Sequence, residues 1–201
     1  MKKQKTLGIS LVVTGILCIA AAGILWGIQA YEETRAGKDT EILLAELNRE
    51  MKIREDELIF DTVKAEEPVQ GEMPQIQWSG YNLMGVLGIP CLEMELPVMN
   101  TWDYDLVKIA PCRYSGSING NDLILLAHNY KRHFGPLKRL EIGDVVNVTD
   151  VNGVITAYEV AKLETLEKTE LDRLTSSDYP LTLFTCTSGG QARLVIRCQL
   201  M

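Results

Sequence analysis

The sequence has little of what metal sites, disulfide scaffolds and nucleic-acid interfaces require. It holds two histidines and five cysteines in 201 residues, with no C-x-x-C pair. Because zinc sites gather closely spaced Cys and His ligands, we expect no metal ion and no cofactor. The odd number of scattered cysteines argues against a disulfide framework, although a Cys91–Cys112 pair stays open. A formal net charge of −7, with no Lys- or Arg-rich block in the long carboxyl-terminal part, argues against nucleic-acid binding.

What the sequence does have is one long apolar run near its amino terminus. Residues 7–28 carry no charged side chain, and these 22 residues would form a helix of about 33 Å, enough to span a hydrocarbon core of about 30 Å. Lys2, Lys3 and Lys5 precede the run, and acidic residues dominate after it. Because lysine and arginine concentrate on the cytoplasmic side of a membrane helix, we expect a cytoplasmic amino terminus and an extracellular chain after residue 30.

Two other structures could account for this run. A cleaved signal peptide has an apolar region of about 7–15 residues followed by a small-residue site, which is shorter than the run seen here. A buried helix of a soluble core is the second alternative, and the length and terminal position of the run argue against it. We therefore predict that residues 1–30 form a cytoplasmic tip and an uncleaved, single-pass anchor in the cell membrane.

Residues 31–77 predict a stalk and a linker between the anchor and a folded domain. Apolar residues recur at helical spacing within positions 39–58, with charged residues between them, which indicates a helix. We expect this helix to be a solvated stalk. Positions 61–77 are acidic and interrupted by two prolines and a glycine, which is typical of a linker.

Residues 78–201 predict a small domain made mostly of strands. Short apolar or alternating runs are separated by turn residues, as in "LILLAH" and in the pair "YPLTLFTC" and "ARLVIRCQL". "DVVNVTD" and "VITAYEVAKLE" flank "VNG", in which Asn152 and Gly153 predict a hairpin turn. Only "FGPLKRL" and "TELDRLTS" are typical of short helices. The pattern indicates a mostly antiparallel barrel or sandwich with one or two short helices.

A cysteine at the end of one apolar run and a histidine at the end of another are candidates for a nucleophilic pair. Cys186 follows residues 181–185, and His128 follows residues 123–127. A cysteine reacts as its thiolate and needs a neighbouring base or cation, because its ordinary pKa is about 8.5. If the two strands are neighbours, both side chains emerge at the same rim of the domain. The alternative is that Cys186 is a core residue.

An arginine is the third candidate. The six-residue connection "TSGGQA" links Cys186 to Arg193, and its two glycines allow a hairpin that returns Arg193 beside Cys186. Arginine stays charged and presents several directed donors, which suits a developing oxyanion. Arg197 competes for this role because it lies on the same strand face. The hairpin register places Cys198 past the residue opposite Cys186, so we expect separate thiols, and the polar stretch around His133 predicts a surface histidine.

These segments resemble the sortases, the membrane-anchored cysteine transpeptidases of Gram-positive bacteria. "TLFTC" at 182–186 is similar to their T-L-x-T-C signature, and "LLAHNY" resembles the segment that bears their catalytic histidine. "RLVI" at 193–196 resembles their final strand, which opens with the catalytic arginine, and "MGVLGIPCLEMELPVMN" resembles their first two strands. The resemblance covers nearly all of residues 80–201 and implies a closed antiparallel or mixed β-barrel of about eight strands.

The resemblance also implies the activity of a cysteine transpeptidase or peptidase. Cys186 would attack the Thr–Gly carbonyl of an LPXTG-like sorting signal on a secreted protein, giving a thioacyl enzyme, with His128 as acid and base and Arg193 at the oxyanion. An amine of a peptidoglycan precursor, or another amine nucleophile, would then resolve the thioester. Thr185 and Asn129 are the expected supporting or substrate-binding residues, although Thr185 also suits a strand for its β-branched shape alone.

Two further features concern the acceptor and the rival functions. Pilus-polymerising members of this family often carry a lid with an Asp-Pro-aromatic motif and a second membrane span, and the sequence has neither, which favours attachment to the cell wall. A thiol hydrolase would use the same three residues and release the peptide to water. A non-catalytic surface module would need none of them.

Overall fold

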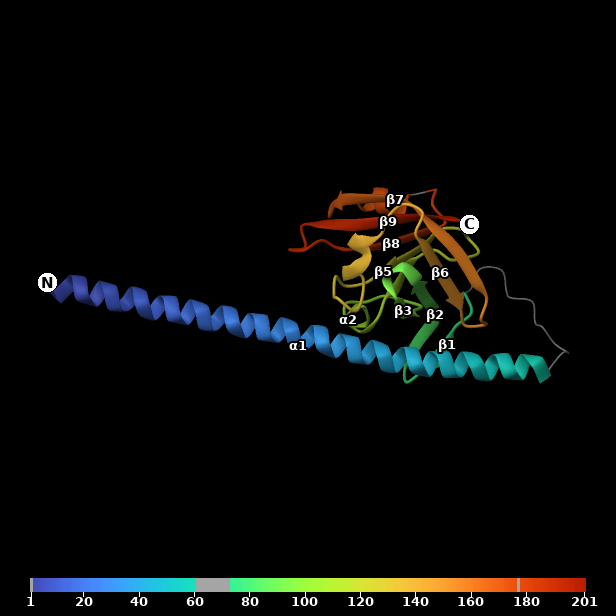
Figure 1. Ribbon diagram of the computed structural model, residues 1–201, viewed down its shortest axis with the longest axis horizontal. Helices are drawn as coiled ribbons and strands as arrows, with labels where there is room; N and C mark the ends of the chain where they lie inside the picture. Colours follow the sequence, from blue (N-terminus) through green and yellow to red (C-terminus); the bar gives the residue numbers. More distant parts are fainter. Residues whose placement is uncertain (1, 61–72, 177) are drawn as a thin grey trace. The chain divides into compact units, whose positions relative to one another are not determined.

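Helix α1 (Lys2–Phe60) begins the chain and contributes to both of the compact units into which the chain divides, Met1–Arg35 and Ala36–Met201. The structure is a computed structural model that describes residues 2–60, 73–176 and 178–201 (Figure 1). In the first unit the described residues are all helical, and the second unit contains every strand that the structure describes.

From Val13 onward, the part of α1 in the first unit exposes its large apolar side chains. Ile19 exposes 76% and Trp26 75% of its surface, and none of the most apolar 18-residue stretch is buried within the protein. That stretch has a mean hydropathy of 1.8. By length and composition the helix can therefore cross a membrane, as the sequence predicts for residues 7–28.

Eight strands of the second unit form a closed barrel, as the sequence predicts (Figure 1). The order of neighbours is β2-β3-β4-β5-β8-β9-β7-β6, and a pairing of β6 with β2 closes the ring, while β1 adds a short edge strand on β2. The barrel is mixed because β3–β4 and β5–β8 are parallel pairs. The strands are β1 (Ile76–Trp78), β2 (Tyr81–Ile89), β3 (Met94–Met99), β4 (Cys112–Ser115), β5 (Leu123–Leu126), β6 (Val145–Asp150), β7 (Ile155–Glu167), β8 (Leu181–Cys186) and β9 (Ala192–Leu200).

Closure of the barrel depends on a glycine in β2. Gly85 has a φ of +148°, and a Cβ atom built on it would lie 2.0 Å from the carbonyl oxygen of Thr149 on β6. The register of β2 against β3 also shifts between Leu83 and Gly85, which marks a bulge. A residue without a side chain is needed here because β2 must bend and still approach β6 closely.

Apart from α1, each helix that the structure describes in the second unit has three to five residues. The two that the sequence predicts appear as the 3₁₀ helix η2 (Gly135–Arg139) and as α3 (Leu171–Thr175). Two more, η1 (Pro90–Leu92) and α2 (Leu106–Ile109), were not expected. Each of these is about one turn long, too short to show helical periodicity in a sequence.

The barrel has an apolar interior and a separate apolar cluster on its outside, divided by the alternation of the strands. On β8, Leu183 belongs to the interior cluster. Its neighbour Phe184 belongs to an outer cluster with Ile124 of β5, Val195 of β9 and Leu174 of α3. This outer cluster covers the same face of β5, β8 and β9, because successive side chains on a strand point to opposite faces.

The second part of α1 packs against the barrel, so the prediction of a solvated stalk is wrong for this part of the helix. Leu43 and Leu47 expose only 2% and 1% of their surfaces. They belong to one apolar cluster with residues of β2 and α2, among them Val86 and Val107. The apolar residues recognised at helical spacing thus form a stripe that is buried on the domain rather than exposed to water.

The expected linker at 61–77 can be compared with the structure only at its end, since residues 61–72 lie outside the described residues. Met73 is 8% and Ile76 4% exposed, and β1 pairs with β2 in antiparallel register. The last five positions of the expected linker are therefore part of the folded domain, because Met73 is buried in it and Ile76 and Gln77 belong to the edge strand β1.

Docking of α1 predicts different effects for two neighbouring apolar residues. Leu47→Ala should lower the free energy of unfolding by about 2–5 kcal/mol, since it leaves a cavity between helix and barrel. Ile42→Ala, at a site that is 60% exposed, should change it by less than about 0.5 kcal/mol. Urea unfolding of the full chain in detergent measures both. Equal effects at the two positions would show that the helix is not docked in solution.

Candidate active site

The parallel pairing of β5 with β8 brings the ends of two apolar runs together. Leu126 lies opposite Phe184 in the register, and the amide of Ala127 donates a hydrogen bond of 3.3 Å to the carbonyl of Phe184. Continuing this register by two residues places His128 beside Cys186. The predicted adjacency of the two strands is therefore confirmed.

The antiparallel hairpin of β8 and β9 adds an arginine. Cys186 and Arg193 are directly paired in the register. The turn between them is closed by a hydrogen bond of 2.8 Å from the amide of Gly190 to the carbonyl of Thr187. Gly189 and Gly190 have φ values of +89° and +71°, in the left-handed region that favours glycine. The predicted glycine turn and the return of Arg193 to Cys186 are confirmed.

The three side chains leave the sheet on the same face, away from the barrel interior. The adjacent residues Ala127 and Leu194 belong to the interior cluster or pack on it. Because faces alternate along a strand, His128, Cys186 and Arg193 lie on the outer face. All three are half-buried. The fold thus gathers a thiol, an imidazole and a guanidinium at one edge of three neighbouring strands.

The two buried cysteines, Cys112 and Cys198, are less suited than Cys186 to act as nucleophiles. All five cysteines are free, so the Cys91–Cys112 pair is not formed, and Cys198 lies opposite Leu181, apart from Cys186. Burial raises the pKa of Cys198 to about 12. Burial, together with the charge of Asp103, does the same for Cys112. Their thiolate forms are therefore strongly disfavoured, whereas Cys186 is half-exposed at the end of its strand.

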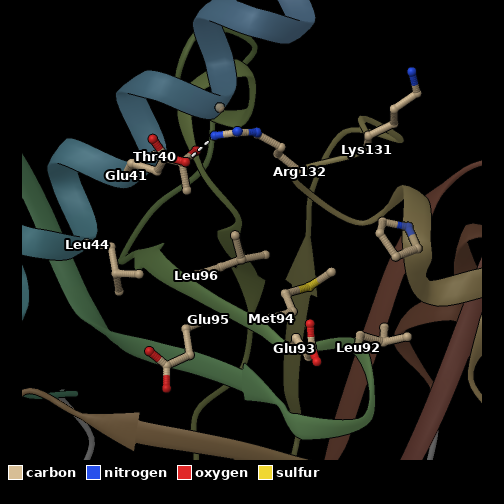
Figure 2. A pocket seen from close by; sticks show the side chains of 12 residues that line it. Thr40, Glu41, Leu44, Leu92, Glu93, Met94, Glu95, Leu96, Lys131 and Arg132 are labelled. Atoms are coloured by element: carbon tan, nitrogen blue, oxygen red, sulfur yellow. Dashed lines mark hydrogen bonds and ion pairs between the residues drawn. The ribbon is translucent and has the colours of Figure 1, made fainter.

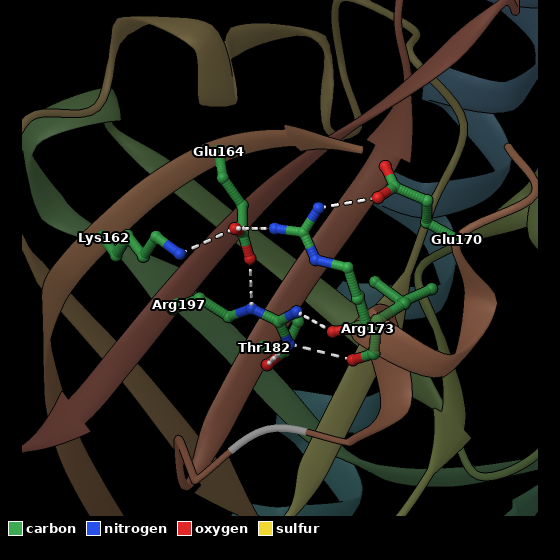
Figure 3. Close-up of polar contacts among 7 residues, drawn as sticks. Lys162, Glu164, Glu170, Arg173, Thr182 and Arg197 are labelled. Atoms are coloured by element: carbon green, nitrogen blue, oxygen red, sulfur yellow. Dashed lines mark hydrogen bonds and ion pairs between the residues drawn. The ribbon is translucent and has the colours of Figure 1, made fainter. Parts of the chain in front are cut away.

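Arg197, the competing arginine, is fully engaged elsewhere (Figure 3). Its side chain is 2% exposed, and its Nε donates to a carboxylate oxygen of Glu164 at 3.0 Å. Nη1 donates to the carbonyl of Leu174 at 2.9 Å and to the hydroxyl of Thr182 at 3.0 Å, and Nη2 donates to the carbonyl of Arg173 at 2.5 Å. These bonds leave Arg193 as the arginine beside the thiol.

The contacts of Arg197 join three strands to α3. Glu164 on β7 also accepts hydrogen bonds from Lys162, at 2.7 Å, and from Arg173 of α3, at 3.5 Å (Figure 3). Burial alone would raise the pKa of Glu164, but the hydrogen bonds from Lys162 and Arg197 outweigh it and hold the pKa below its ordinary value. The ion pairs and the capped carbonyls of α3 therefore fix this helix over the outer cluster.

The two expected supporting residues occupy different environments. Thr185 is 1% exposed, and its hydroxyl donates a hydrogen bond of 2.8 Å to the carbonyl of Ala127, the residue before His128. Asn129, the residue after His128, is exposed. Thr185 is therefore placed to hold the histidine strand rather than to meet a ligand, while Asn129 is accessible from solvent.

His133 was expected at the surface, and this prediction is wrong. The residue is fully buried, and its Nε2 lies 2.9 Å from the hydroxyl of Thr40 on α1. Burial, followed by the charge of His128, lowers the pKa of His133 to about 4. The polar residues around His133 suggested an exposed stretch. The sequence did not predict that α1 packs against this stretch and buries His133.

Aromatic residues around the site were not recognised in the sequence. Tyr130 stacks on His128 with ring centroids 4.8 Å apart and an interplanar angle of 26°. Phe184 meets Tyr114 edge-on at 5.3 Å, and Tyr114 stacks on Trp102 at 5.4 Å. The only signal for Tyr130 was its spacing of two residues from the histidine. Tyr114 and Trp102 come from other segments, and their meeting depends on strand order.

The described part of the chain offers no obvious place for a metal ion. No group of three or more His, Cys, Asp or Glu side chains lies together there in a way that could hold one.

A family model described as the sortase domain matches residues 87–201. This match covers more than half of the chain and includes all three gathered side chains. A comparison with curated proteins found no relative of the sequence.

Solved structures similar to this chain are also sortases. Sortase C1 from Streptococcus suis is 26% identical, with a TM-score of 0.51 over 59% of this chain and 73% of its own. A Clostridium perfringens sortase C with the C-terminal cell wall sorting motif is 22% identical, with a TM-score of 0.55 over 79% of this chain and 89% of its own. A Clostridium perfringens sortase D5 transpeptidase is 18% identical, with a TM-score of 0.56 over 76% and 99%.

The two arginines of β9 should differ in their effect on stability. Arg197→Met should lower the free energy of unfolding by roughly 3–5 kcal/mol, because it breaks a buried ion pair and leaves the α3 carbonyls unpaired. Arg193→Met, on the same strand face but half-buried, should cost less than about 1 kcal/mol. Urea unfolding of the full chain compares them. A larger loss for Arg193→Met would mean that the structural and the accessible arginine have been interchanged.

Proposed function

The chain belongs to the sortase family, and from this we propose that it cleaves an LPXTG-like sorting signal through a thioacyl intermediate on Cys186 and transfers the polypeptide to a cell-wall amine. The observation that carries the proposal is the register of β5, β8 and β9, which sets His128 and Arg193 on either side of Cys186. Transpeptidase activity follows from membership of the sortase family. The roles of the residues, the sorting signal and the acceptor amine are what we propose.

The first half of the reaction forms the thioacyl enzyme. The thiolate of Cys186 attacks the carbonyl carbon of the Thr–Gly bond, and a C–S bond forms while negative charge develops on the carbonyl oxygen. The guanidinium of Arg193 donates hydrogen bonds to that oxygen. The C–N bond then breaks, and His128 gives its proton to the departing glycine amine.

The second half transfers the acyl group. An amine of a peptidoglycan precursor attacks the thioester carbonyl, His128 accepts a proton from that amine, and the C–S bond breaks to restore the thiolate. Thr185 would support this exchange by holding the carbonyl of Ala127 and so the strand that ends at His128. Asn129 is exposed next to the base and is a candidate contact for substrate.

The membrane helix suits this role. Lys2, Lys3 and Lys5 before the apolar run favour a cytoplasmic amino terminus and an extracellular barrel, as in a single-pass protein of a Gram-positive cell membrane. Both proposed substrates, a secreted protein still held by its carboxyl-terminal signal and a lipid-linked wall precursor, would then meet the enzyme on one surface. The similar Clostridium perfringens sortase C solved with a cell wall sorting motif supports this class of donor.

An acceptor amine should change the products of the reaction. With an LPXTG-like peptide alone, the full chain should release the carboxyl-terminal fragment slowly. With a triglycine or diaminopimelate acceptor it should form the new amide. Cys186→Ala should abolish both products, and Arg193→Lys should lower kcat/KM roughly 100-fold, the scale expected for loss of an oxyanion donor. Mass spectrometry of the products measures each of these.

Cys91→Ala provides the matched control, since this exposed thiol lies outside the site and its loss should leave the rates unchanged. Cleavage that proceeds equally with and without amine, and yields only acid, would indicate a thiol hydrolase instead. Full activity in Cys186→Ala would exclude the proposed nucleophile.

A further inference from the structure

A column of side chains runs from His128 to helix α1. The ring of Tyr130 stacks on that of His128 with centroids 4.8 Å apart, and the centroid of the His133 ring lies 5.5 Å from that of Tyr130, at an interplanar angle of 46°. The Nε2 atom of His133 then lies 2.9 Å from the hydroxyl of Thr40. We propose that Tyr130, His133 and Thr40 are positioning residues that orient the imidazole of His128 for proton transfer at Cys186, an inference that rests on the proposed function.

The contacts of the Thr40 hydroxyl indicate which nitrogen of His133 carries the proton. This hydroxyl lies 2.8 Å from the carbonyl of Ala36 and 2.5 Å from the carbonyl of Ile109, and carbonyls only accept hydrogen bonds. We therefore assign the single hydroxyl proton to a carbonyl, which makes Nε2 of His133 the donor to the hydroxyl oxygen. Its Nδ1 is then a lone pair, and it has no hydrogen-bond partner among the described residues. His133 is thus a neutral ring with one defined tautomer.

The main chain around the column is equally constrained. The carbonyl of His128 accepts a hydrogen bond of 3.1 Å from the amide of Phe134. The carbonyl of Tyr130 accepts bonds from the amides of His133, at 3.1 Å, and Gly135, at 2.9 Å. A Cβ atom on Gly135 would lie 2.6 Å from that carbonyl oxygen, so only glycine fits without movement. The loop therefore has little freedom with which to move the stacked rings independently.

Thr40 and Glu41 of helix α1 both form polar contacts with this loop. A cavity of about 270 Å³ lies between α1, the connection of β2 to β3, and the loop after His128, and both Thr40 and Glu41 line it (Figure 2). Glu41 forms an ion pair with Arg132 of the loop, in which both side chains are more than half exposed. The buried contact is that of Thr40, which is 4% exposed. Thr40 is therefore the residue through which α1 bears on the column.

Proton transfer requires the imidazole to be held near one orientation, because a small misplacement of a catalytic group reduces the rate strongly. A half-exposed histidine has two rotatable bonds, and a stacked ring on one face restricts both. The neutral state of His133 also matters, since a second positive charge behind Tyr130 would oppose protonation of His128. Tyr130, His133 and Thr40 therefore orient the imidazole of His128 and place no positive charge next to it.

The test uses the full chain in detergent and measures kcat, KM and melting temperature. Thr40→Val keeps the shape of Thr40 and removes its hydroxyl, and Tyr130→Leu removes the stacked ring. Both should lower kcat about tenfold or more and leave KM within about twofold. Tyr130→Phe should restore kcat because it retains the ring. Glu41→Gln is the matched control, since it breaks the neighbouring exposed ion pair and should leave kcat unchanged.

A second readout does not depend on activity. The chain has only two histidines, so the protein labelled with ¹³C-histidine gives two ring signals in NMR spectra. Thr40→Val should shift or broaden the ring signal of His128, although the hydroxyl of Thr40 contacts His133 and not His128. Glu41→Gln should leave the His128 signal unchanged. If the wild type and Cys186→Ala are equally inactive, the proposed function is wrong. The NMR result still tests whether Thr40 affects the environment of His128. An unchanged His128 signal in Thr40→Val, or an unchanged kcat with only a lower melting temperature, would show that these residues stabilise the fold without orienting His128.

Discussion

The main-chain ladder that joins β8 to β5 on one side and to β9 on the other is the constraint on which the site depends. It determines which residues are neighbours where the strands end, and the alternation of the strands determines the face on which they emerge. His128 is far from Cys186 and Arg193 in the sequence, and the three side chains meet only because this register holds. A slip of one residue in either pairing would turn a side chain of the site into the barrel interior.

Two buried polar arrangements support this register from outside the barrel. On one side, Arg197 binds Glu164, Thr182 and the last carbonyls of α3, and so ties β7, β8 and β9 to the helix over the outer cluster. On the other side, α1 packs on β2 and reaches the loop of His128 through Thr40. The second part of α1 is therefore part of the same compact unit as the barrel, while its first part is the apolar segment that can cross a membrane.

Much of the site could be predicted from sequence because its determinants are local. The length of the connection after Cys186 and its two glycines were enough to predict the hairpin and the pairing with Arg193, and the ends of two apolar runs indicated His128 and Cys186. The docking of α1 could not be predicted from the sequence. An apolar stripe indicates that a helix packs against something, but it does not identify the surface that the helix packs against. The burial of His133 followed from that contact, so it was missed as well. Arg197 lies on the face of Arg193, and only the positions of Glu164 and α3 distinguish the two.

In the proposed reaction the substrate becomes covalently joined to the sulfur of Cys186, and identifying the modified residue tests this most directly. The full chain would be incubated with an LPXTG-like peptide without an amine acceptor, quenched in acid, and mapped by tandem mass spectrometry. The account predicts an acyl group ending in threonine on the peptide that contains Cys186, and none on Cys91 or the buried thiols. An acyl group on another residue, or an unmodified Cys186 while the signal is being cleaved, would contradict it.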